Sequence, residues 1–367
     1  MLKWNYESGL EKSTGYEEVI DTLKSYTKEK YEKANEEDKL KMVEEVFDIY
    51  RSINIFPIYY YNEEGIRKEI KKCVDKPVSF EGDVLNLRFN QGSSLCKFLF
   101  PNLNDVECKG AKNNSMLKRF YNDHKLKRAI ELSLRIKKSV TPSEVRTALE
   151  LIGGNVATNF KAMNAKALYE KYCPSNGVIY DFACGFGGRM LGALTSKNNY
   201  SYVGVEPCVE TFNNLLSLGT YIEKTTNRED IFRINCIGSE DYKLPKESVD
   251  FAFSSPPYFN LEQYSQEDTQ CYNRYKDLEE WFEKYVRLTI RNIYHGLKKE
   301  RYYAVNIADY KDGKDLVGLV DKWIEISKEE GFEFIEQIYM KLQSRRGEGH
   351  RKENGTHKKE GIFVFKK

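Results

Sequence analysis

The chain has 367 residues, of which 40% are hydrophobic and 31% charged, and its 58 Lys and Arg nearly balance its 56 Asp and Glu. This length exceeds what one hydrophobic core usually holds, so two domains are expected. A formal charge of +2 excludes a protein that is polycationic throughout, and any nucleic-acid surface must be a local patch. The chain has no apolar run of membrane-spanning length and its polar start is unlike a secretory signal, which predicts a cytoplasmic protein without a membrane partner.

The eight cysteines and four histidines are scattered along the chain, and no two cysteines form a Cys-x-x-Cys pair. Structural zinc sites and disulfide frameworks both depend on close, regular spacing of such residues. We therefore predict reduced thiols and no bound metal.

Residues 1–150 are predicted to form a mostly helical N-terminal domain, with a pair of amphipathic helices between residues 17 and 51. From Ala111 to Arg146, ten basic residues stand against three acidic ones. The basic residues are Lys112, Lys118, Arg119, Lys125, Lys127, Arg128, Arg135, Lys137, Lys138 and Arg146. This segment either neutralises backbone phosphates or forms the solvated face of an amphipathic helix, and the residues leave both interpretations open.

From residue 151 to residue 367, short apolar runs alternate with helical patterns, which is typical of a doubly wound parallel sheet. The predicted strands are residues 178–182, 202–205, 231–237, 249–253, 302–307, 332–341 and 362–365. Seven strands in this order, ending in a hairpin, predict an α/β domain of Rossmann-like architecture. The hairpin loop, 342–360, is rich in Gly and basic residues, and it either contacts phosphates or is only solvated.

The first of these strands runs into a glycine-rich loop that begins at Asp181 and continues through Ala183, Gly185 and Gly187. Glycines here allow a tight turn and bring backbone amides close to a ligand. A carboxylate at Asp181 suits a cationic amino group, and Glu206, at the end of the next strand, suits both hydroxyls of a ribose. An NADP-like ligand would require a basic residue at that second position instead.

A polar turn follows the third strand, and two of its side chains, Ser239 and Glu240, are candidates to face the amino group of an adenine. A simple turn without a ligand is an equally good interpretation of this segment.

The fourth strand ends in Ser255-Pro256-Pro257-Tyr258, at the edge of the sheet where open α/β folds bind their ligands. Two consecutive prolines cannot continue a strand ladder, so they stiffen the chain at this point. We predict that this motif carries the chemistry. The polar segment that follows it, 260–274, is either a lid over a bound substrate or an ordinary surface loop.

These motifs together resemble the amino-methyltransferases of nucleic acids, as found among phage and bacterial DNA N4-cytosine and N6-adenine methyltransferases. In that family, Asp, Asn or Ser precedes Pro-Pro and an aromatic residue, as Ser255–Tyr258 do here, and a loop like Asp181–Gly187 holds the cofactor. Residues 159–169 resemble the cofactor-contacting stretch that precedes this loop, with Phe160 as the contact, although the proline expected after Phe160 is absent. The resemblance covers residues 158–367.

The resemblance implies the seven-stranded fold of S-adenosylmethionine-dependent methyltransferases, with S-adenosyl-L-methionine as the cofactor. It implies that Ser255 and the Pro256 carbonyl accept the protons of an exocyclic base amine, that Tyr258 stacks on the base, and that the base is flipped out of the duplex. A serine at the first position slightly favours cytosine over adenine. Because the sheet fills the C-terminal part, residues 1–150 are the candidate for DNA docking and target recognition.

Three other functions stay open on these residues: an RNA base methyltransferase, a methyltransferase of protein glutamine amides, and a non-catalytic nucleic-acid-binding protein that keeps the fold. The recognition sequence, the oligomeric state and a restriction–modification partner do not follow from the residues.

Overall fold

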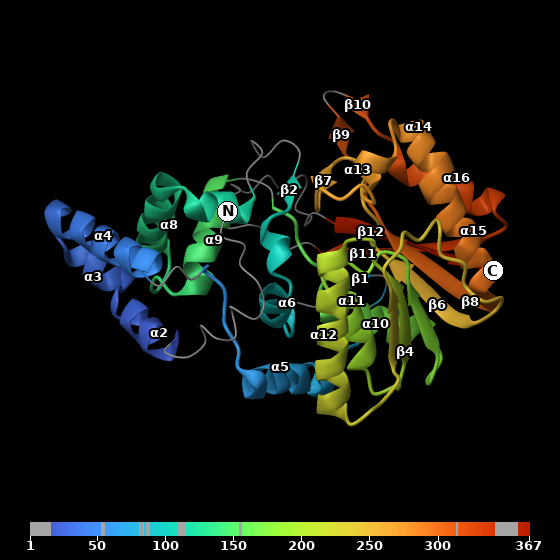
Figure 1. Cartoon of the computed structure of the whole chain (residues 1–367), viewed down its shortest axis with the longest axis horizontal. Helices are drawn as coiled ribbons and strands as arrows, with labels where there is room; N and C mark the ends of the chain where they lie inside the picture. The colour runs from blue at the N-terminus through green and yellow to red at the C-terminus, as the bar shows by residue number, and fades with distance from the viewer. Residues whose placement is uncertain are drawn as a thin grey trace. The chain divides into compact units, whose positions relative to one another are not determined.

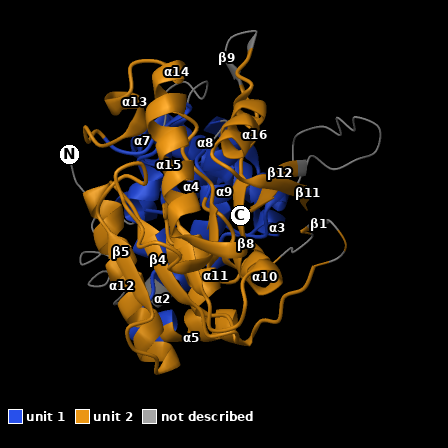
Figure 2. Cartoon of the chain, turned by 90° about the vertical axis from the view of Figure 1, so that its right-hand side faces the viewer, with its two compact units in different colours: residues 1–66, 97–158, 261–265 blue, residues 67–96, 159–260, 266–367 orange. Residues whose placement is uncertain are grey.

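The computed structural model describes residues 16–52, 56–80, 82, 84–85, 89–108, 115–153, 156–312, 315–341 and 359–367. The chain divides into two compact units (Figure 2). Unit 1 comprises residues 1–66, 97–158 and 261–265, and unit 2 comprises residues 67–96, 159–260 and 266–367. The division near residue 158 lies close to the predicted domain boundary at residue 150. Residues 67–96, however, group with the C-terminal unit, and residues 261–265 group with the N-terminal one.

Unit 1 is mostly helical, as its amphipathic pattern predicted. The expected helix pair between residues 17 and 51 consists of three helices, because the chain leaves helical geometry around Thr27 and Ala34. Its elements are α2 (Tyr16–Ser25), α3 (Lys28–Lys33), α4 (Glu36–Ser52), the 3₁₀ turn η1 (Pro101–Asn104), β2 (Glu107–Cys108), α7 (Met116–Tyr121), α8 (Asp123–Ile136), α9 (Pro142–Gly153) and β7 (Glu262–Gln263). Helices α5 (Glu63–Asp75) and α6 (Ser93–Leu99) each cross a unit boundary.

Unit 2 is built on an eight-stranded sheet in the order β1-β11-β12-β8-β6-β3-β4-β5. Strands β4, β6, β8, β11 and β12 of this sheet are labelled in Figure 1. The strands are β1 (Val84–Leu85), β3 (Val178–Asp181), β4 (Ser201–Val205), β5 (Phe232–Asn235), β6 (Val249–Ser254), β8 (Leu297–Asn306), β11 (Glu333–Lys341) and β12 (Lys359–Lys366). Every neighbouring pair is parallel except those that β12 makes with β8 and β11. All seven predicted strands are therefore confirmed, and β1 is an eighth that was not predicted.

This strand order, with one antiparallel strand inserted beside the last parallel one, is the methyltransferase variant of the Rossmann-like fold. The predicted fold class is thus confirmed. A short antiparallel pair, β9 (Lys311–Asp312) and β10 (Asp315–Leu316), lies outside the main sheet. Of the predicted hairpin loop, 342–360, residues 342–358 lie outside the described residues, and the last two residues begin β12.

Helices cover both faces of the sheet, and the pleat of β6 shows which residues face each layer. Phe251 and Phe253 meet the ring of Tyr169 on one face, whereas Ala252 belongs to the apolar cluster on the other, as expected from the two-residue repeat of a strand. The helices of this unit are α10 (Ala162–Tyr172), α11 (Gly188–Leu194), α12 (Val209–Thr226), α13 (Cys271–Arg274), α14 (Leu278–Trp281), the π-helical turn η2 (Phe282–Val286), α15 (Arg287–Gly296) and α16 (Leu319–Glu329).

Two glycines set the close approach of α10 and α11. A Cβ on Gly188 would lie 2.0 Å from the Phe160 carbonyl oxygen, and one on Gly192 would lie 2.3 Å from the Ala162 carbonyl oxygen. Both obstacles are backbone atoms and cannot rotate away. The packing of these helices therefore depends on glycine, and it places residues 159–162 against the start of α11.

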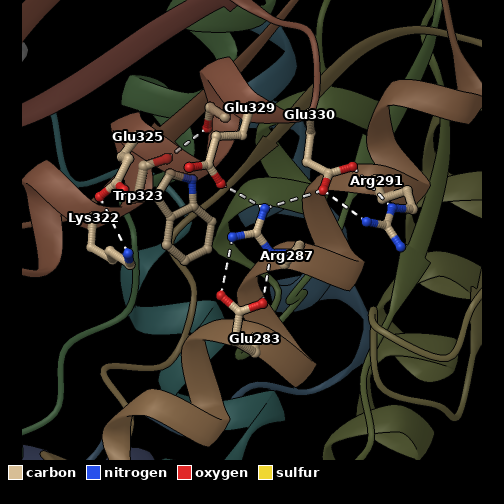
Figure 3. A network of polar contacts seen from close by, with 9 residues as sticks. Glu283, Arg287, Arg291, Lys322, Trp323, Glu325, Glu329 and Glu330 are labelled. Carbon is tan, nitrogen blue, oxygen red and sulfur yellow. Dashed lines mark hydrogen bonds and ion pairs between the residues drawn. The ribbon is translucent and has the colours of Figure 1, made fainter.

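On the other face, a network of charged side chains joins α15 to the end of α16 (Figure 3). Arg287 donates to Glu283 one turn before it at 2.8 Å and pairs with Glu329 at 2.8 Å, while Arg291 pairs with Glu330 at 2.9 Å. Arg287 and Glu330 are mostly buried, but each pair has one member that is about half-exposed. Water therefore screens every pair, and each contributes little stability. The apolar contacts beneath the network, with Trp323 and Ile290 fully buried, hold the layer together.

Candidate functional site

The strands β3 and β6 lie side by side at the point where the strand order reverses, since the chain runs from β3 outward to β5 and then returns to β6 on the other side. The carboxyl ends of two such strands border the crevice that binds ligands in open α/β sheets. Here Ser254, the last residue of β6, donates a hydrogen bond from Oγ to Oδ1 of Asp181, the last residue of β3, at 2.8 Å. This bond brings the glycine-rich loop and the Pro-Pro motif together.

Asp181 is fully buried, and its two carboxylate oxygens accept bonds from several internal donors. Oδ2 accepts from Arg189 Nε at 2.8 Å and from the Tyr202 hydroxyl at 2.6 Å, and Oδ1 accepts from Ser254 and, at 3.2 Å, from the Ala183 amide. Asp181 was expected to receive the amino group of a ligand. In this structure it instead ties two strands and the loop to one another.

The cation in this cluster, Arg189, is 4% exposed. Burial alone would lower the pKa of its guanidinium, but the neighbouring Asp181 carboxylate more than offsets this, so the pKa of Arg189 is raised. Arg189 also donates to the Ala183 carbonyl. One arginine, at the first turn of α11, therefore holds the loop at two points.

The loop itself leaves an opening at Gly185. Gly185 and Gly187 have φ values of 55° and 75°, which L-residues with side chains rarely adopt. A Cβ on Gly185 would meet nothing closer than 3.9 Å, so the backbone is accessible there. Ala183 and Gly185 are half-buried, whereas the residues around them in the loop are buried. These two residues are the part of the predicted cofactor loop that a ligand can reach.

Glu206 lies directly beyond β4, and its carboxylate faces the glycine-rich loop. Oε2 accepts the Gly185 amide at 2.9 Å, and Oε1 accepts the Cys208 amide at 3.0 Å. A carboxylate has about four acceptor positions, so each oxygen retains capacity for one more donor. Burial raises the pKa of Glu206 to about 7 although both amides and Arg189 favour the charged form.

Phe160, which the sequence resemblance suggests as a cofactor contact, lies beside the same loop, with its carbonyl oxygen close to Gly188. Its ring packs edge-on against Phe253 at a centroid distance of 5.2 Å and is 9% exposed. The preceding Asn159 donates from Nδ2 to the Phe186 carbonyl at 2.6 Å. The missing proline has therefore not displaced this stretch from the loop, although the Phe160 ring is largely enclosed by protein.

The two candidates after β5 have different surroundings. Ser239 is buried, and its Oγ bonds to Thr289 Oγ1 of α15 at 2.7 Å, so its side chain is held against α15. Glu240 is 8% exposed, and its Oε1 accepts from Arg274 and from the Tyr275 hydroxyl, each at 2.7 Å. Its Oε2 is buried without a hydrogen-bond partner. Of the two, Glu240 is the one with a buried oxygen that has no hydrogen-bond partner.

The motif Ser255–Tyr258 follows β6 directly. Ser255 is half-buried, in contrast to the fully buried Ser254 before it, because it lies just beyond the end of β6, whose residues are all buried. The Tyr258 hydroxyl accepts the Ala308 amide at 3.1 Å and donates to Glu360 Oε1 at 3.3 Å. The hydroxyl end of the Tyr258 ring is thus held by two bonds, one to the chain just beyond β8 and one to the start of β12.

Phe259 closes the motif in a left-handed conformation, with φ of 50°. This costs a side-chain-bearing residue about 1 kcal/mol, which packing must offset. The ring lies 6.1 Å from that of Trp281 and packs on the cluster beneath α14–α16. Phe259 therefore anchors the end of the motif in the core.

The segment 260–274 is divided between the units. Residues 261–265 belong to unit 1, where β7 pairs with β2 through the partners Gln263 and Glu107. Residues 266–274 belong to unit 2 and contain α13. A lid over a substrate stays a prediction for this segment.

The basic segment of unit 1 differs from its predicted role at two positions. Arg119 and Arg146 are 0% and 5% exposed, and their guanidiniums bond internally to the Leu149 carbonyl at 3.3 Å and to Asn104 at 2.6 Å. Neither is placed to contact a phosphate on the surface. Lys112 lies outside the described residues. Lys118, Lys127 and Arg135 form ion pairs with Glu107, Glu44 and Glu131. Within the described part of the chain, Lys125, Arg128, Lys137 and Lys138 have no ion-pair partner.

Several residues of this site escaped the sequence analysis. Arg189, Tyr202 and Ser254 complete the Asp181 cluster, and Arg274 and Tyr275 complete the Glu240 corner. Arg189 follows the glycines directly in the sequence. An arginine so close to the aspartate at the end of a strand was the one signal that could have indicated an ion pair. The others become neighbours only through strand pairing and loop packing.

No described helix combines the length and apolarity that crossing a bilayer requires. Within the described ranges, no three His, Cys, Asp or Glu residues are grouped as metal ligands would be. All eight cysteines are free thiols, and six of them are buried.

No protein-family model and no curated protein matches this sequence. Among solved structures, the [4+2]-cyclase SpnF is 12% identical to this chain, with a TM-score of 0.38. The match covers 56% of this chain and 82% of the SpnF chain. A SAM-dependent methyltransferase from Methanosarcina mazei is 12% identical with a TM-score of 0.35, and the match covers 55% of this chain and 96% of that one. Geranyl diphosphate C-methyltransferase from Streptomyces coelicolor is 9% identical with a TM-score of 0.37, and the match covers 53% of this chain and 74% of that one. The strand order described above, rather than these likenesses, defines the fold.

Proposed function

We propose that this protein is an S-adenosylmethionine-dependent methyltransferase that methylates the exocyclic amino group of a nucleic-acid base, with DNA as the favoured substrate. The observation that carries the proposal is the 2.8 Å bond between Ser254 and Asp181 at the switch point of the sheet. It places a rigid Ser-Pro-Pro-Tyr motif beside a glycine-rich loop, so a methyl donor in the loop and an acceptor at the motif would be neighbours.

The residues around the loop fit the adenosine part of S-adenosyl-L-methionine. The Glu206 carboxylate retains one acceptor position on each oxygen for a ribose diol, and Gly185 leaves its backbone open to a ligand. Glu240 Oε2 is a buried acceptor without a donor, which suits the amino group of adenine. An unsatisfied buried acceptor costs about 1–3 kcal/mol, so a ligand that supplies a donor is favoured there.

The chemistry assigned to the motif follows from the nature of the acceptor. The bound cofactor supplies a methyl group on a positively charged sulfur. The nitrogen of an aromatic amine is a weak nucleophile, because its lone pair is delocalised into the ring. Ser255 Oγ and the Pro256 carbonyl accept its two N–H groups, which favours a tetrahedral nitrogen and aligns its lone pair for transfer. Tyr258, fixed through its hydroxyl, supplies a flat face for the flipped-out base.

A nucleic-acid substrate is supported by the basic residues on α8 and just after it. Lys125 and Arg128 lie one turn apart, and neither has a carboxylate partner among the residues that the structure describes. Cations free of such pairs are available to phosphates. A protein glutamine amide would require no such surface.

The proposal is tested by incubating the purified full chain with methyl-labelled cofactor and, separately, unmethylated genomic DNA, total RNA and a glutamine-containing protein extract. We expect label in DNA, as N4-methylcytosine or N6-methyladenine by nucleoside mass spectrometry. The double variant Lys125→Gln, Arg128→Gln should weaken DNA binding and reduce its salt dependence by about two ion contacts, with cofactor affinity unchanged. Label in RNA alone or in protein alone would show that this macromolecule, and not DNA, is the substrate. Label in none of the three, with cofactor bound, would refute the proposed activity.

Cofactor affinity should depend on pH through Glu206. Its pKa is about 7 in the free protein, because burial outweighs the two amide donors, with Asp181 raising and Arg189 lowering it further. Ribose hydroxyls bind best to the carboxylate, so binding lowers this pKa and releases a proton. Below pH 7 the affinity for S-adenosylhomocysteine should fall by up to tenfold per pH unit, and above pH 8 it should be flat.

Calorimetric titration in two buffers of different ionisation enthalpy measures both quantities. Wild-type protein should release about one proton per ligand at pH 6 and almost none at pH 8.5, whereas Glu206→Gln should bind weakly with no pH dependence. Glu229→Gln, an exposed residue beyond α12, is the matched control and should behave as wild type. Proton release that persists in Glu206→Gln would assign the titration to another group.

A further inference from the structure

The corner around Glu240 is asymmetric. Arg274 Nη1 and the Tyr275 hydroxyl both donate to Oε1, each at 2.7 Å, whereas Oε2 accepts nothing. Oε2 lies against Gly238, where a Cβ would come within 2.4 Å of it. A side chain on residue 238 would therefore occupy the space beside Oε2. One oxygen is held by two donors, and the other is kept free beside a glycine.

The residues that hold Oε1 come from the segment that follows the catalytic motif along the chain. Arg274 ends α13 and also pairs through Nη2 with Asp241 at 2.6 Å. Earlier in the same segment, Glu267 accepts the Val209 amide at 3.2 Å, at the start of α12 and three residues beyond Glu206. Residues 266–275 are thus bonded directly to the Glu240 carboxylate at one end and to the first residue of α12, three positions beyond Glu206, at the other.

We propose that Arg274 and Tyr275 are positioning residues that orient Glu240, so that its free Oε2 accepts the amino group of the cofactor's adenine and discriminates against a purine without one. This inference rests on the proposed function. It assigns part of the cofactor specificity to the segment after Ser255–Tyr258, which the sequence analysis considered only as a lid or a loop.

Charge is the physical reason that both residues are needed. Burial raises the pKa of Glu240 above its usual range, and the Tyr275 hydroxyl and the Arg274 guanidinium limit that rise. These two donors favour the carboxylate form, which can only accept. Without them the pKa rises further, and a protonated carboxyl can donate to the carbonyl oxygen of hypoxanthine instead. Loss of the pair therefore removes the preference for an amino group rather than simply weakening the site.

The ligands that test this are S-adenosylhomocysteine and S-inosylhomocysteine, which differ by the amino group of the purine. Calorimetric dissociation constants for both would be measured on the full chain. Wild type should prefer the adenosyl ligand by roughly 10- to 100-fold, the range expected for one buried acceptor left unpaired. The double variant Arg274→Gln, Tyr275→Phe should bind the two ligands within about threefold of each other, chiefly because the adenosyl ligand binds less well.

The single variants and a surface control separate positioning from general damage. Tyr275→Phe keeps the buried ring, and Arg274 is about one-third exposed in its side chain, so both should fold with unchanged circular dichroism. Arg233→Gln, an exposed arginine on β5, should keep the wild-type ratio. A double variant that weakens both ligands equally would overturn the positioning role. Wild type that binds both ligands equally well would overturn only this inference, whereas wild type that binds neither would overturn the proposed function as well.

Discussion

Replacing Ser255 by alanine should lower the rate of methyl transfer by at least 100-fold while leaving the affinity for S-adenosylhomocysteine within about twofold of wild type. Removing one oriented hydrogen-bonding group from a transition state typically costs about 10²- to 10³-fold in kcat. Ser255 is half-buried and lies beyond the end of β6, so the substitution leaves no void in the core. Single-turnover rates and equilibrium binding of the cofactor product measure the two quantities separately.

The adjacent serine provides the matched control. Ser254 is fully buried and bonds to Asp181, so Ser254→Ala should lower the free energy of unfolding by about 1 kcal/mol and weaken the cofactor product. Its effect on the transfer step itself should be small. Equal losses of cofactor affinity and transfer rate in Ser255→Ala would show that Ser255 also has a structural role and would contradict the assignment.

Replacing Arg189 by methionine should destabilise unit 2 by about 3–5 kcal/mol, the usual cost of leaving one member of a buried ion pair unpaired. The Asp181 carboxylate would remain fully buried with only neutral donors, from Tyr202, Ser254 and the Ala183 amide. A loss of this size lowers Tm by roughly 10 °C in a unit of this length. Thermal unfolding followed by circular dichroism measures it.

Two further variants identify the cause. Asp181→Asn combined with Arg189→Met removes the uncompensated charge, so the double variant should be more stable than Arg189→Met alone. Arg291→Met breaks an ion pair whose arginine is 57% exposed, in the network of Figure 3, and should cost less than about 1 kcal/mol. If the surface substitution were as costly as the buried one, burial would not be the source of the effect.

Some features of this protein followed from local patterns alone. The seven strands were predictable because buried parallel strands are short apolar runs between turn residues. The helical patterns between them separate one strand from the next along the chain. The glycine-rich loop and the Ser-Pro-Pro-Tyr motif were predictable because glycine and proline constrain the backbone locally. Glycine permits positive φ, and paired prolines end a strand, whatever the rest of the fold is. Glu206 was found because it ends a strand next to that loop.

Other features depend on residues that are distant in sequence. The eighth strand, β1, has two residues, and it exists only because the edge of β11 offers a partner, so no run of apolar residues could have indicated it. The basic segment looked uniform in sequence, yet burial removes Arg119 and Arg146 from its surface. Periodicity indicates a buried face, but it does not show which long cationic side chain turns inward to meet a carbonyl.

By itself, then, the sequence determined the fold class, the succession of strands along the chain and the two motifs, because each is specified by periodicity or by backbone constraints acting over a few residues. Only the tertiary structure decided that Asp181 is enclosed by Arg189, Tyr202 and Ser254, and that Glu240 keeps one oxygen free. Those side chains lie up to 73 positions apart, as Asp181 and Ser254 do, and only the pairing of β3 with β6 brings them together. A hydrogen bond of this kind depends on the position of atoms in three dimensions, which strand register and loop packing set.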